Sequence, residues 1–356
     1  MNGKGLKISD IFQRTRTIKN RLILDSLMVG IITGVVIVVY RILASKLAVF
    51  FNYLYGYADK NILMIPAVFI LLAASAFVVA EFVKKEPMIS GSGIPQLEGI
   101  LSRKLSINRM KVLFYKFVGG VICLGAGLSV GREGPSVQMG GCIGEEFSKR
   151  GKKPDYEEVY LTTCGASAGL SAAFNAPMSG VMFALEEAHK NFSPMILLSA
   201  MIASLTADCV AKQFFGIIPS LKFNQLNIMP IKYYWVLIIL GIAVGISGVI
   251  FNSGILKTQK MFKESKLNRY VKIMIPFFVT GIIGMISPIL TGGGHELIME
   301  LQSTDFMLMT LVVFLVVKFI FTFVCFGSGV PGGIFFPLLV LGALVGNIVG
   351  LISIRY

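Results

Sequence analysis

The sequence carries little charge for its length, since only 15% of its 356 residues are Asp, Glu, Lys or Arg and 55% are hydrophobic. A soluble domain carries about 25% charged residues, so this chain has too few charges to cover a surface that faces water. Its mean hydropathy of +0.77 points the same way. The shortage of charge argues against a soluble enzyme and a disordered protein.

Cysteine and histidine are also scarce. The chain has two histidines, and its five cysteines form no CxxC pair and lie in apolar or glycine-rich sequence. We therefore expect no disulfide framework, no metal site and no cofactor. The cysteines are expected to be small buried hydrophobic side chains, and they are Cys123, Cys142, Cys164, Cys209 and Cys325.

Acidic residues are few beside basic ones, with 19 Asp and Glu against 33 Lys and Arg and a net charge of +14. In a soluble protein this excess would suggest nucleic acid. Here the basic residues cluster at the ends of apolar runs, and residues 1–21 hold only one acid, Asp10. The positive-inside rule therefore predicts a cytoplasmic N-terminus, and we expect no nucleic-acid partner. No signal-peptide cleavage pattern precedes the first apolar run, which is read as a span.

Apolar runs long enough to span or re-enter a membrane occupy most of the chain. They lie at about 22–52, 62–84, 110–130, 159–188, 194–215, 231–256, 273–290, 307–326 and 334–353. Glycine is abundant, with 38 residues, and Gly or Pro interrupts several runs. Broken helices at membrane depth are tolerated only inside protein or beside a polar cavity, and paired interruptions point to a transport site. The sequence therefore predicts an all-α polytopic membrane protein with broken and re-entrant helices.

Three short pieces share one pattern, in which Gly is followed by three residues and then Pro, at 91–95, 131–135 and 333–337. Proline fits the first turn of a helix, and glycine before it lets the backbone turn sharply. Each piece therefore predicts a helix that begins within the membrane. A helix N-terminus offers free N–H groups and partial positive charge, so three together predict a site for a small anion. The alternative interpretation is that Gly and Pro merely kink the helices.

The stretches GSGIPQLEG (91–99), GREGPSVQMG (131–140), AAFNAPMSGVMFALEE (172–187) and GSGVPGGIFFP (327–337) resemble the CLC family of chloride channels and proton-coupled chloride transporters. They occur in the order and spacing of that family, and the resemblance covers nearly the whole chain. It implies inverted-topology repeats, chloride held at helix N-termini, and a homodimer with one pore per subunit. Chloride, protons and the lipid bilayer are the partners that it implies, and the protein is not expected to be an enzyme.

The resemblance also implies roles for individual residues. Ser92 would donate its hydroxyl to the central chloride, with Gly93, Ile94 and Pro95 completing that helix start, and Ile334 and Phe335 would add backbone N–H groups. Glu133 matches the gating glutamate of the family, which fills an anion position when ionised and swings away when protonated. Its alternative role is to stabilise a helix N-terminus. The other residues of the selectivity motifs are Gly91, Gly131, Arg132, Gly134, Pro135, Gly333, Phe336 and Pro337.

A second acid separates an exchanger from a channel. Glu187 matches the internal glutamate that transfers protons in exchangers of the family, although Glu186 and Glu187 could instead be solvated at the membrane edge, since His189 and Lys190 follow. We therefore expect secondary active exchange of chloride for protons, with a passive voltage- or pH-gated chloride channel as the alternative. Ser92 favours chloride over fluoride, because the fluoride-exporting branch departs from serine there.

Two further patterns give hypotheses. Lys116 lies within an apolar run, and because a buried cation usually needs a partner we expect it to pair with Glu98. Residues 165–169 match GxSxG around Ser167, which leaves an intramembrane serine hydrolase as a remote alternative. No strand precedes Ser167, and the small residues there suit close packing of helices.

The length of the chain conflicts with two complete repeats. The motif at 131 recurs at 333, an offset of 202 positions, so the counterpart of Asn175 should fall near 377, beyond Tyr356. We therefore expect a second repeat that lacks roughly 60 or more residues, either in a truncated and inactive homologue or in a member that closes its pore differently. Tyr356 lies too early to be the chloride-coordinating tyrosine of the family.

The expected organisation has three parts. These are a cytoplasmic basic segment at 1–21, a first transmembrane repeat at 22–215 and an incomplete second repeat at 231–356. The expected location is the cell membrane, with a homodimer once the C-terminal part is supplied.

Overall fold

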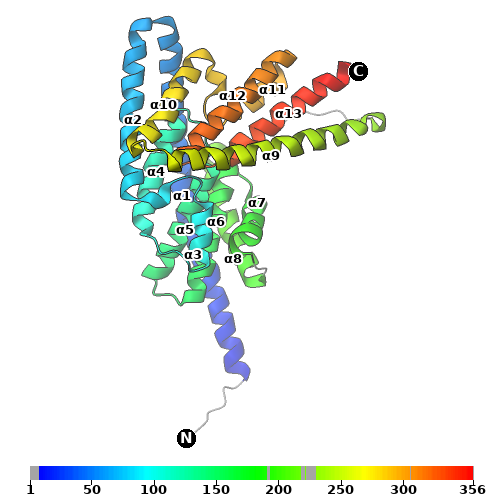
Figure 1. Cartoon of the computed structure of the whole chain (residues 1–356). Helices are drawn as coiled ribbons and strands as arrows, with labels where there is room; N and C mark the ends of the chain where they lie inside the picture. The colour runs from blue at the N-terminus through cyan, green and yellow to red at the C-terminus, as the bar shows by residue number, and fades with distance from the viewer. Residues whose placement is uncertain (1–7, 191–192, 218–220, 222–229, 305, 356) are drawn as a thin grey trace. The chain divides into compact units, whose positions relative to one another are not determined.

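A computed structural model describes residues 8–190, 193–217, 221, 230–304 and 306–355, and these residues form helices joined by short loops (Figure 1). Regular strands are absent from this described part, where two isolated β-bridges occur instead. The fold is therefore all-α, as the apolar runs predict. Tyr356 and residues 1–7 of the basic N-terminal segment lie outside the described residues.

The α-helices follow one another with few long connections (Figure 1). They are α1 (Ile8–Lys60), α2 (Ile65–Lys85), α3 (Ile94–Leu101), α4 (Arg109–Gly125), α5 (Glu133–Arg150), α6 (Asp155–Phe174), α7 (Pro177–Phe183), α8 (Pro194–Phe215), α9 (Trp235–Glu264), α10 (Arg269–Ile286), α11 (His295–Ser303), α12 (Leu308–Gly327) and α13 (Phe335–Arg355). Several begin at or beside proline, where the missing N–H costs no hydrogen bond.

Seven segments are long and apolar enough to cross a membrane, within the residues that the structure describes. They are Lys19–Lys60, Ile62–Lys85, Pro194–Phe215, Ile231–Glu264, Arg269–Ile286, Leu308–Gly327 and Phe335–Ser353. Each coincides with an apolar run predicted from the sequence. The other two runs, at 110–130 and 159–188, fold into α4, α6 and α7, which are not among these seven segments. The chain is thus a multi-pass membrane protein with broken helices.

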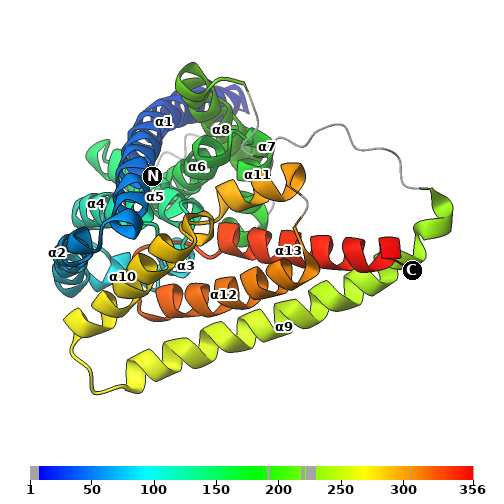
Figure 2. The same cartoon turned by 90° about the horizontal axis from the view of Figure 1, so that it is seen from above.

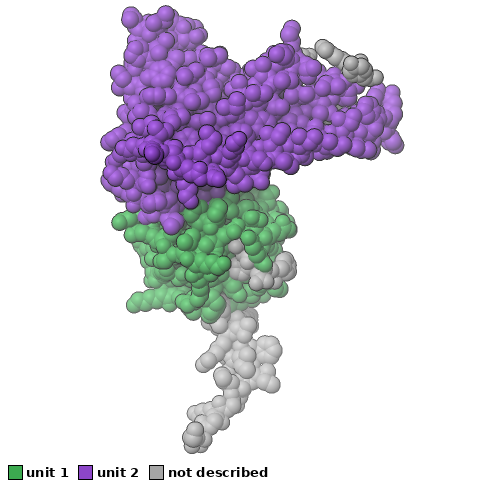
Figure 3. Space-filling view, in the orientation of Figure 1, with its two compact units in different colours: residues 1–39, 94–113, 136–217 green, residues 40–93, 114–135, 218–356 purple. Residues whose placement is uncertain are grey.

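The described helices form two compact units (Figure 3). Unit 1 comprises residues 1–39, 94–113 and 136–217, and unit 2 comprises residues 40–93, 114–135 and 218–356. The units interleave along the chain, whereas the expected parts at 1–21, 22–215 and 231–356 are consecutive. Those parts divide the chain by repeats rather than by contacts, and they stay a prediction.

Glycine lets two helices of unit 1 approach closely. A Cβ on Gly140 or on Gly144 in α5 would meet the backbone of α6, and one on Gly165 would meet the carbonyl of Gly140. Small residues at four-residue spacing are typical of closely packed membrane helices. Ser167 belongs to the same packing, because it is fully buried in the middle of α6 and its hydroxyl lies 3.1 Å from that of Ser204. It therefore lacks the strained strand-to-helix turn that a serine hydrolase requires.

In unit 2, α9 runs beside α12 and α13 (Figures 1 and 2). Phe251 and Ile255 of α9 form a buried cluster with Phe326 and Leu341. Four of the five cysteines are buried, as predicted, whereas Cys209 is exposed on α8, and that expectation was wrong for it. A single apolar face of a membrane helix can point toward lipid, so an apolar neighbourhood in the sequence does not establish burial in protein.

Candidate functional site

Three non-helical loops of unit 2 meet through backbone hydrogen bonds. Gly91 pairs with Pro331, and Gly131 pairs with Gly333, in two isolated bridges. The N–H of Gly131 donates to the carbonyl of Gly333 at 2.7 Å, and the reverse bond has the same length. The N–H of Gly91 donates to the Val330 carbonyl at 3.2 Å. These bonds bring together pieces that lie far apart in the sequence, as the anion-site hypothesis requires.

A helix begins in each of the three Gly-xxx-Pro pieces. α3 begins at Ile94, α5 at Glu133 and α13 at Phe335. The prediction of three helix starts is therefore confirmed, and the alternative of simple kinks is wrong. Each helix start leaves its first N–H groups without partners inside the helix, which is the property that suits an anion.

Ser92 packs tightly against the start of α5. A Cβ on Gly134 would lie 2.7 Å from the Ser92 carbonyl oxygen and 2.8 Å from the Ser92 Cβ, so only glycine fits at 134. Gly91 and Gly93, on either side of Ser92, have φ of +67° and +92°, which favour glycine. The conformation of the loop at Ser92 therefore depends on three glycines, Gly91 and Gly93 through their positive φ and Gly134 through its close approach to Ser92.

Glu133 is buried, with 2% of its surface exposed. Its carboxylate lies near the backbone N–H groups of Arg132, Glu133 and Phe336, which belong to the starts of α5 and α13. In the described part of the chain neither carboxylate oxygen makes a well-formed hydrogen bond. The carboxylate thus occupies a place where backbone dipoles would hold an anion.

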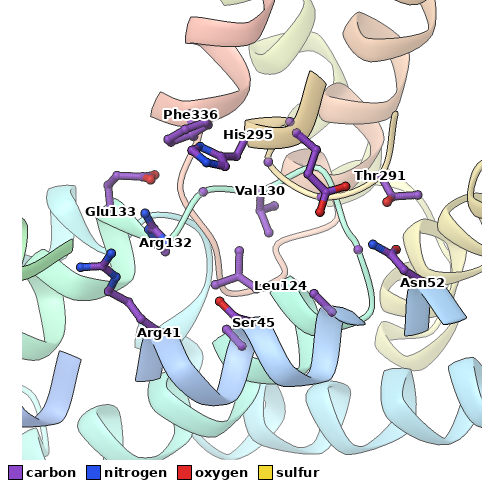
Figure 4. Close-up of a pocket in the computed structure, with 18 residues that line it drawn as sticks. Arg41, Ser45, Asn52, Leu124, Val130, Arg132, Glu133, Thr291, His295 and Phe336 are labelled. Atoms are coloured by element: carbon purple, nitrogen blue, oxygen red, sulfur yellow. The ribbon is translucent and has the colours of Figure 1, made fainter. Parts of the chain in front are cut away.

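A pocket of about 180 Å³ opens beside Glu133 (Figure 4). We call it the Glu133 pocket, and besides Glu133 its charged or ionisable lining residues are Arg41, Arg132, His295 and Glu296. The ring of His295 lies 5.8 Å from that of Phe336. Burial, followed by the charges of Arg132 and Arg41, lowers the pKa of His295 below its usual 6.5. When His295 is neutral, the two cations Arg41 and Arg132 face the two acids Glu133 and Glu296, so the lining gains a net positive charge only when one of these acids is protonated.

Two fully buried lysines lie behind the loops. Lys116 donates to the carbonyls of Ile89 at 2.8 Å and Gly91 at 2.6 Å. Lys318 donates to the Gly292 carbonyl at 2.7 Å and to the Ser129 hydroxyl at 3.3 Å. A charged donor forms stronger hydrogen bonds than a neutral one, so each lysine holds a loop carbonyl firmly.

The expected pairing of Lys116 with Glu98 is wrong. The salt bridge of Glu98 is with Lys190, at 3.3 Å, while Lys116 donates to backbone carbonyls. A buried cation can be satisfied by carbonyl dipoles where a loop leaves them outside a helix. Such backbone partners are invisible in the sequence, which shows only the charged side chains that a lysine could pair with.

The structure brings most of the predicted site residues together in unit 2. Ser92 and Gly93 lie with residues 131–135 and 333–337 around the paired loops. Ile94 and Pro95 form the first turn of α3, which the contacts assign to unit 1. Glu187 also lies in unit 1, exposed like Glu186, in a π-helix at Ala184–His189. Its role in proton transfer stays a prediction.

Sequence reasoning missed Arg41, Lys318 and the loop at 291–294 as neighbours of the site. One signal could have found Lys318, because it lies 202 positions after Lys116, the same offset that relates the motifs at 131 and 333. The run of three glycines before His295 was a second signal of a backbone that comes close to other groups. Arg41 lies within an apolar helix, and no local pattern marks it.

Comparison with known families places the chain beside chloride-transporting membrane proteins. The family described as voltage gated chloride channel matches residues 70–355. Curated relatives named H(+)/Cl(-) exchange transporter ClcA include one from Salmonella paratyphi B, 36% identical over 355 residues that cover 97% of this chain and 75% of that protein. One from Salmonella arizonae is 35% identical over 358 residues, covering 98% of this chain and 75% of the relative.

Solved structures agree with these sequence relationships. A slow cyanobacterial Cl⁻/H⁺ antiporter superposes with a TM-score of 0.86 at 30% identity, covering 94% of this chain and 80% of that one. A CLC-type fluoride/proton antiporter has a TM-score of 0.73 at 21% identity, over 96% of this chain and 82% of that one. At that identity the second likeness concerns the fold alone.

Proposed function

This chain belongs to the voltage-gated chloride channel family, and from that premise we propose that it exchanges chloride for protons across the membrane. The single observation that carries the proposal is the position of Glu133, whose buried carboxylate lies among the backbone N–H groups at the starts of α5 and α13. A negative group already stands where an anion would bind. The relatives named as proton/chloride exchangers support the same function.

Competition for this position would couple the two ions. Ionised Glu133 fills the anion position, and a chloride ion that takes its place requires the carboxylate to leave. Leaving is favoured when Glu133 is protonated, because the neutral group loses its attraction to the helix N-termini and to Arg132. Each chloride that passes is thereby linked to a protonation event, which is the requirement for exchange.

Neutral donors would hold chloride deeper in the site. We assign this role to the hydroxyl of Ser92 and to the backbone N–H groups of Ile334 and Phe335, as the family resemblance implies. Hydroxyl and amide donors bind an anion without a full opposing charge, so the anion can be released. The two buried lysines behind the loops, Lys116 and Lys318, are engaged by loop carbonyls.

Proton delivery from the other side is assigned to Glu187. Its position in an exposed π-helix supports the assignment, because π-helical turns are frequent at functional sites. We propose a cytoplasmic N-terminus, which the positive-inside rule supports, and we propose the cell membrane as the location of the protein. We further propose a homodimer, as the resemblance implies.

The test uses purified protein in liposomes, with chloride and protons followed together. An outward chloride gradient should drive proton movement against a proton gradient. Glu133→Gln should abolish the proton movement and leave chloride flux, and Glu187→Gln should do the same while Glu186→Gln, its matched control, leaves coupling intact. Chloride flux without proton movement in the unsubstituted protein would instead identify a passive channel.

A further inference from the structure

A second pocket of unit 2, of about 560 Å³, lies away from Glu133, at the ends of α2 and α9 and the beginning of α10. We call it the basic pocket. Its charged lining residues are Lys263, Arg269 and Lys272, and none of its lining residues is acidic within the part of the chain that the structure describes. Gln259, Ser90 and Ser328 add neutral polar groups, so the pocket offers donors and positive charge together.

The three cations belong to a longer basic series. From the last turns of α9 into the first turn of α10 every third residue is basic, in the order Lys257, Lys260, Lys263, Lys266, Arg269 and Lys272. The single acid of this stretch, Glu264, lies 3.8 Å from Lys260, which leaves the other five cations in excess. A local excess of this size is costly through self-repulsion unless anions come near it.

Two of the three cations of the basic pocket also donate hydrogen bonds to backbone carbonyls. Arg269 donates to the Val83 carbonyl at 3.4 Å, and Lys272 donates to the Ser265 carbonyl at 3.0 Å. Each side chain keeps further N–H donors, because a guanidinium has five and an ammonium three. In the described residues Lys263 makes no salt bridge, and its side chain is exposed. α10 packs against α2, as Figures 1 and 2 both show.

We infer from the ends of the candidate spans that the basic pocket lies at the level of the membrane surface. Two candidate spans end there, Ile62–Lys85 and Ile231–Glu264, and a third, Arg269–Ile286, begins there. Phosphate headgroups occupy this level in a bilayer. The apolar side chains of Phe262 and Leu267 also line the pocket, which suits a molecule with an acyl part beside its charge.

We propose that the basic pocket binds the phosphate headgroup of an anionic phospholipid. Clustered Lys and Arg at the end of a membrane helix attract anionic headgroups, and several charged donors suit a group with several acceptor oxygens. A chloride ion needs neither this volume nor three cations. This proposal does not depend on proton/chloride exchange.

A lipid headgroup bound in the basic pocket would affect the loops that are proposed to bind the anion. Ser90 and residues 327–329 line the basic pocket, and the Ser90 hydroxyl donates to the Gly329 carbonyl at 2.8 Å. Ser90 directly precedes the first Gly-xxx-Pro piece, and 327–331 precedes the last. A bound headgroup therefore contacts the rear of both loops, and anionic lipid should alter transport through them.

The experiment measures lipid binding by the full chain. Purified protein is titrated with phosphatidylglycerol in detergent, with phosphatidylcholine as the neutral comparison, and bound lipid is counted by native mass spectrometry. The test variant replaces Lys263, Arg269 and Lys272 by Gln, and the single variant Lys263→Gln removes the one cation without a backbone bond. The matched control replaces Lys104, Lys111 and Lys152 by Gln, three exposed lysines of unit 1.

The expected loss of phosphatidylglycerol affinity is roughly fivefold for Lys263→Gln and about a hundredfold for the triple variant, with the control unchanged. Equal binding by the triple variant and the control would overturn the proposal, as would equal affinity for phosphatidylcholine. Displacement of the lipid by millimolar inorganic phosphate would show that the site takes free phosphate instead. A triple variant that transports chloride more slowly in pure phosphatidylcholine vesicles, with unchanged lipid binding, would assign the pocket to chloride entry and refute the lipid site.

Discussion

Replacing Gly134 by alanine tests whether the position of Ser92 determines anion binding. The new Cβ would lie 2.7 Å from the Ser92 carbonyl oxygen, and ordinary contact begins at 3.4 Å, so Ser92 must move by about 0.7 Å. Overpacking of this kind costs about 1–3 kcal/mol. Alanine favours a helix over glycine by up to about 1 kcal/mol, but residue 134 lies in the first turn of α5, where this gain is smaller.

The clash therefore outweighs the gain in helix propensity. We expect Gly134→Ala to lower the thermal midpoint in detergent and to weaken chloride binding by about 5- to 100-fold, since about 1.4 kcal/mol corresponds to a factor of ten. Chloride affinity is measured by isothermal titration calorimetry and transport by efflux from liposomes. The signature of the mechanism is that affinity falls while the helix content by circular dichroism stays constant.

Gly342→Ala is the matched control. A Cβ on Gly342 would meet nothing within 4 Å, and this glycine lies within α13. Alanine there should leave chloride affinity unchanged and stabilise the helix slightly. If Gly134→Ala binds chloride as tightly as Gly342→Ala, the reasoning from the packing of Ser92 is refuted.

Three further predictions concern single side chains. The pKa of His295 in the folded state is lowered below 6.5, so the contribution of His295 to stability should be complete above pH 6.5 and be lost as the pH falls through the folded-state pKa. The thermal midpoint should therefore decrease from pH 8 to pH 5, and His295→Phe should make that decrease smaller. Lys116→Met removes the charged donor to the Gly91 carbonyl, so it should lower the free energy of unfolding by about 2 kcal/mol or more and weaken chloride binding. A more stable variant with unchanged chloride affinity would show that the buried charge supports neither stability nor chloride binding. Arg21→Met removes the salt-bridge partner of Glu157, which is fully buried while Arg21 is half exposed. The substitution should lower the free energy of unfolding by about 2 kcal/mol or more in thermal unfolding, and adding Glu157→Gln to the same chain should partly reverse this loss.

Helix starts were predictable because their causes are local. Proline at the second or third helical position and glycine just before the helix determine the backbone at 91–95, 131–135 and 333–337, whatever the rest of the chain does. The existence of the seven spans was equally local, since hydropathy marks each of them, although the first and fourth run eight residues past their predicted ends, to Lys60 and Glu264. These features needed no knowledge of which segments meet.

Partners across the chain were not predictable in the same way. Lys116 is satisfied by carbonyls of a loop about 25 residues away, and the sequence shows side chains but not which backbone groups a fold leaves unpaired. The place of Arg41 beside Arg132 was hidden for a related reason. It depends on how α1 lies against the loop at 131. Charge patterns in a sequence predict contacts between opposite charges, so they do not predict that two arginines lie close together.

The bond between Gly131 and Gly333 has a consequence for biosynthesis. Ribosomes add roughly 5–20 residues each second, so the 202 positions that separate these glycines correspond to about 10–40 s of translation. Throughout this time the loop at 131 resides in the bilayer or the insertion machinery before its partner exists. Its polar backbone must then be shielded by water or by other proteins, because lipid cannot satisfy it. Cellular quality control should therefore act on this protein chiefly while the chain is still incomplete. Mutations in the loop at 333 should lengthen the time for which the polar backbone of the loop at 131 has no partner.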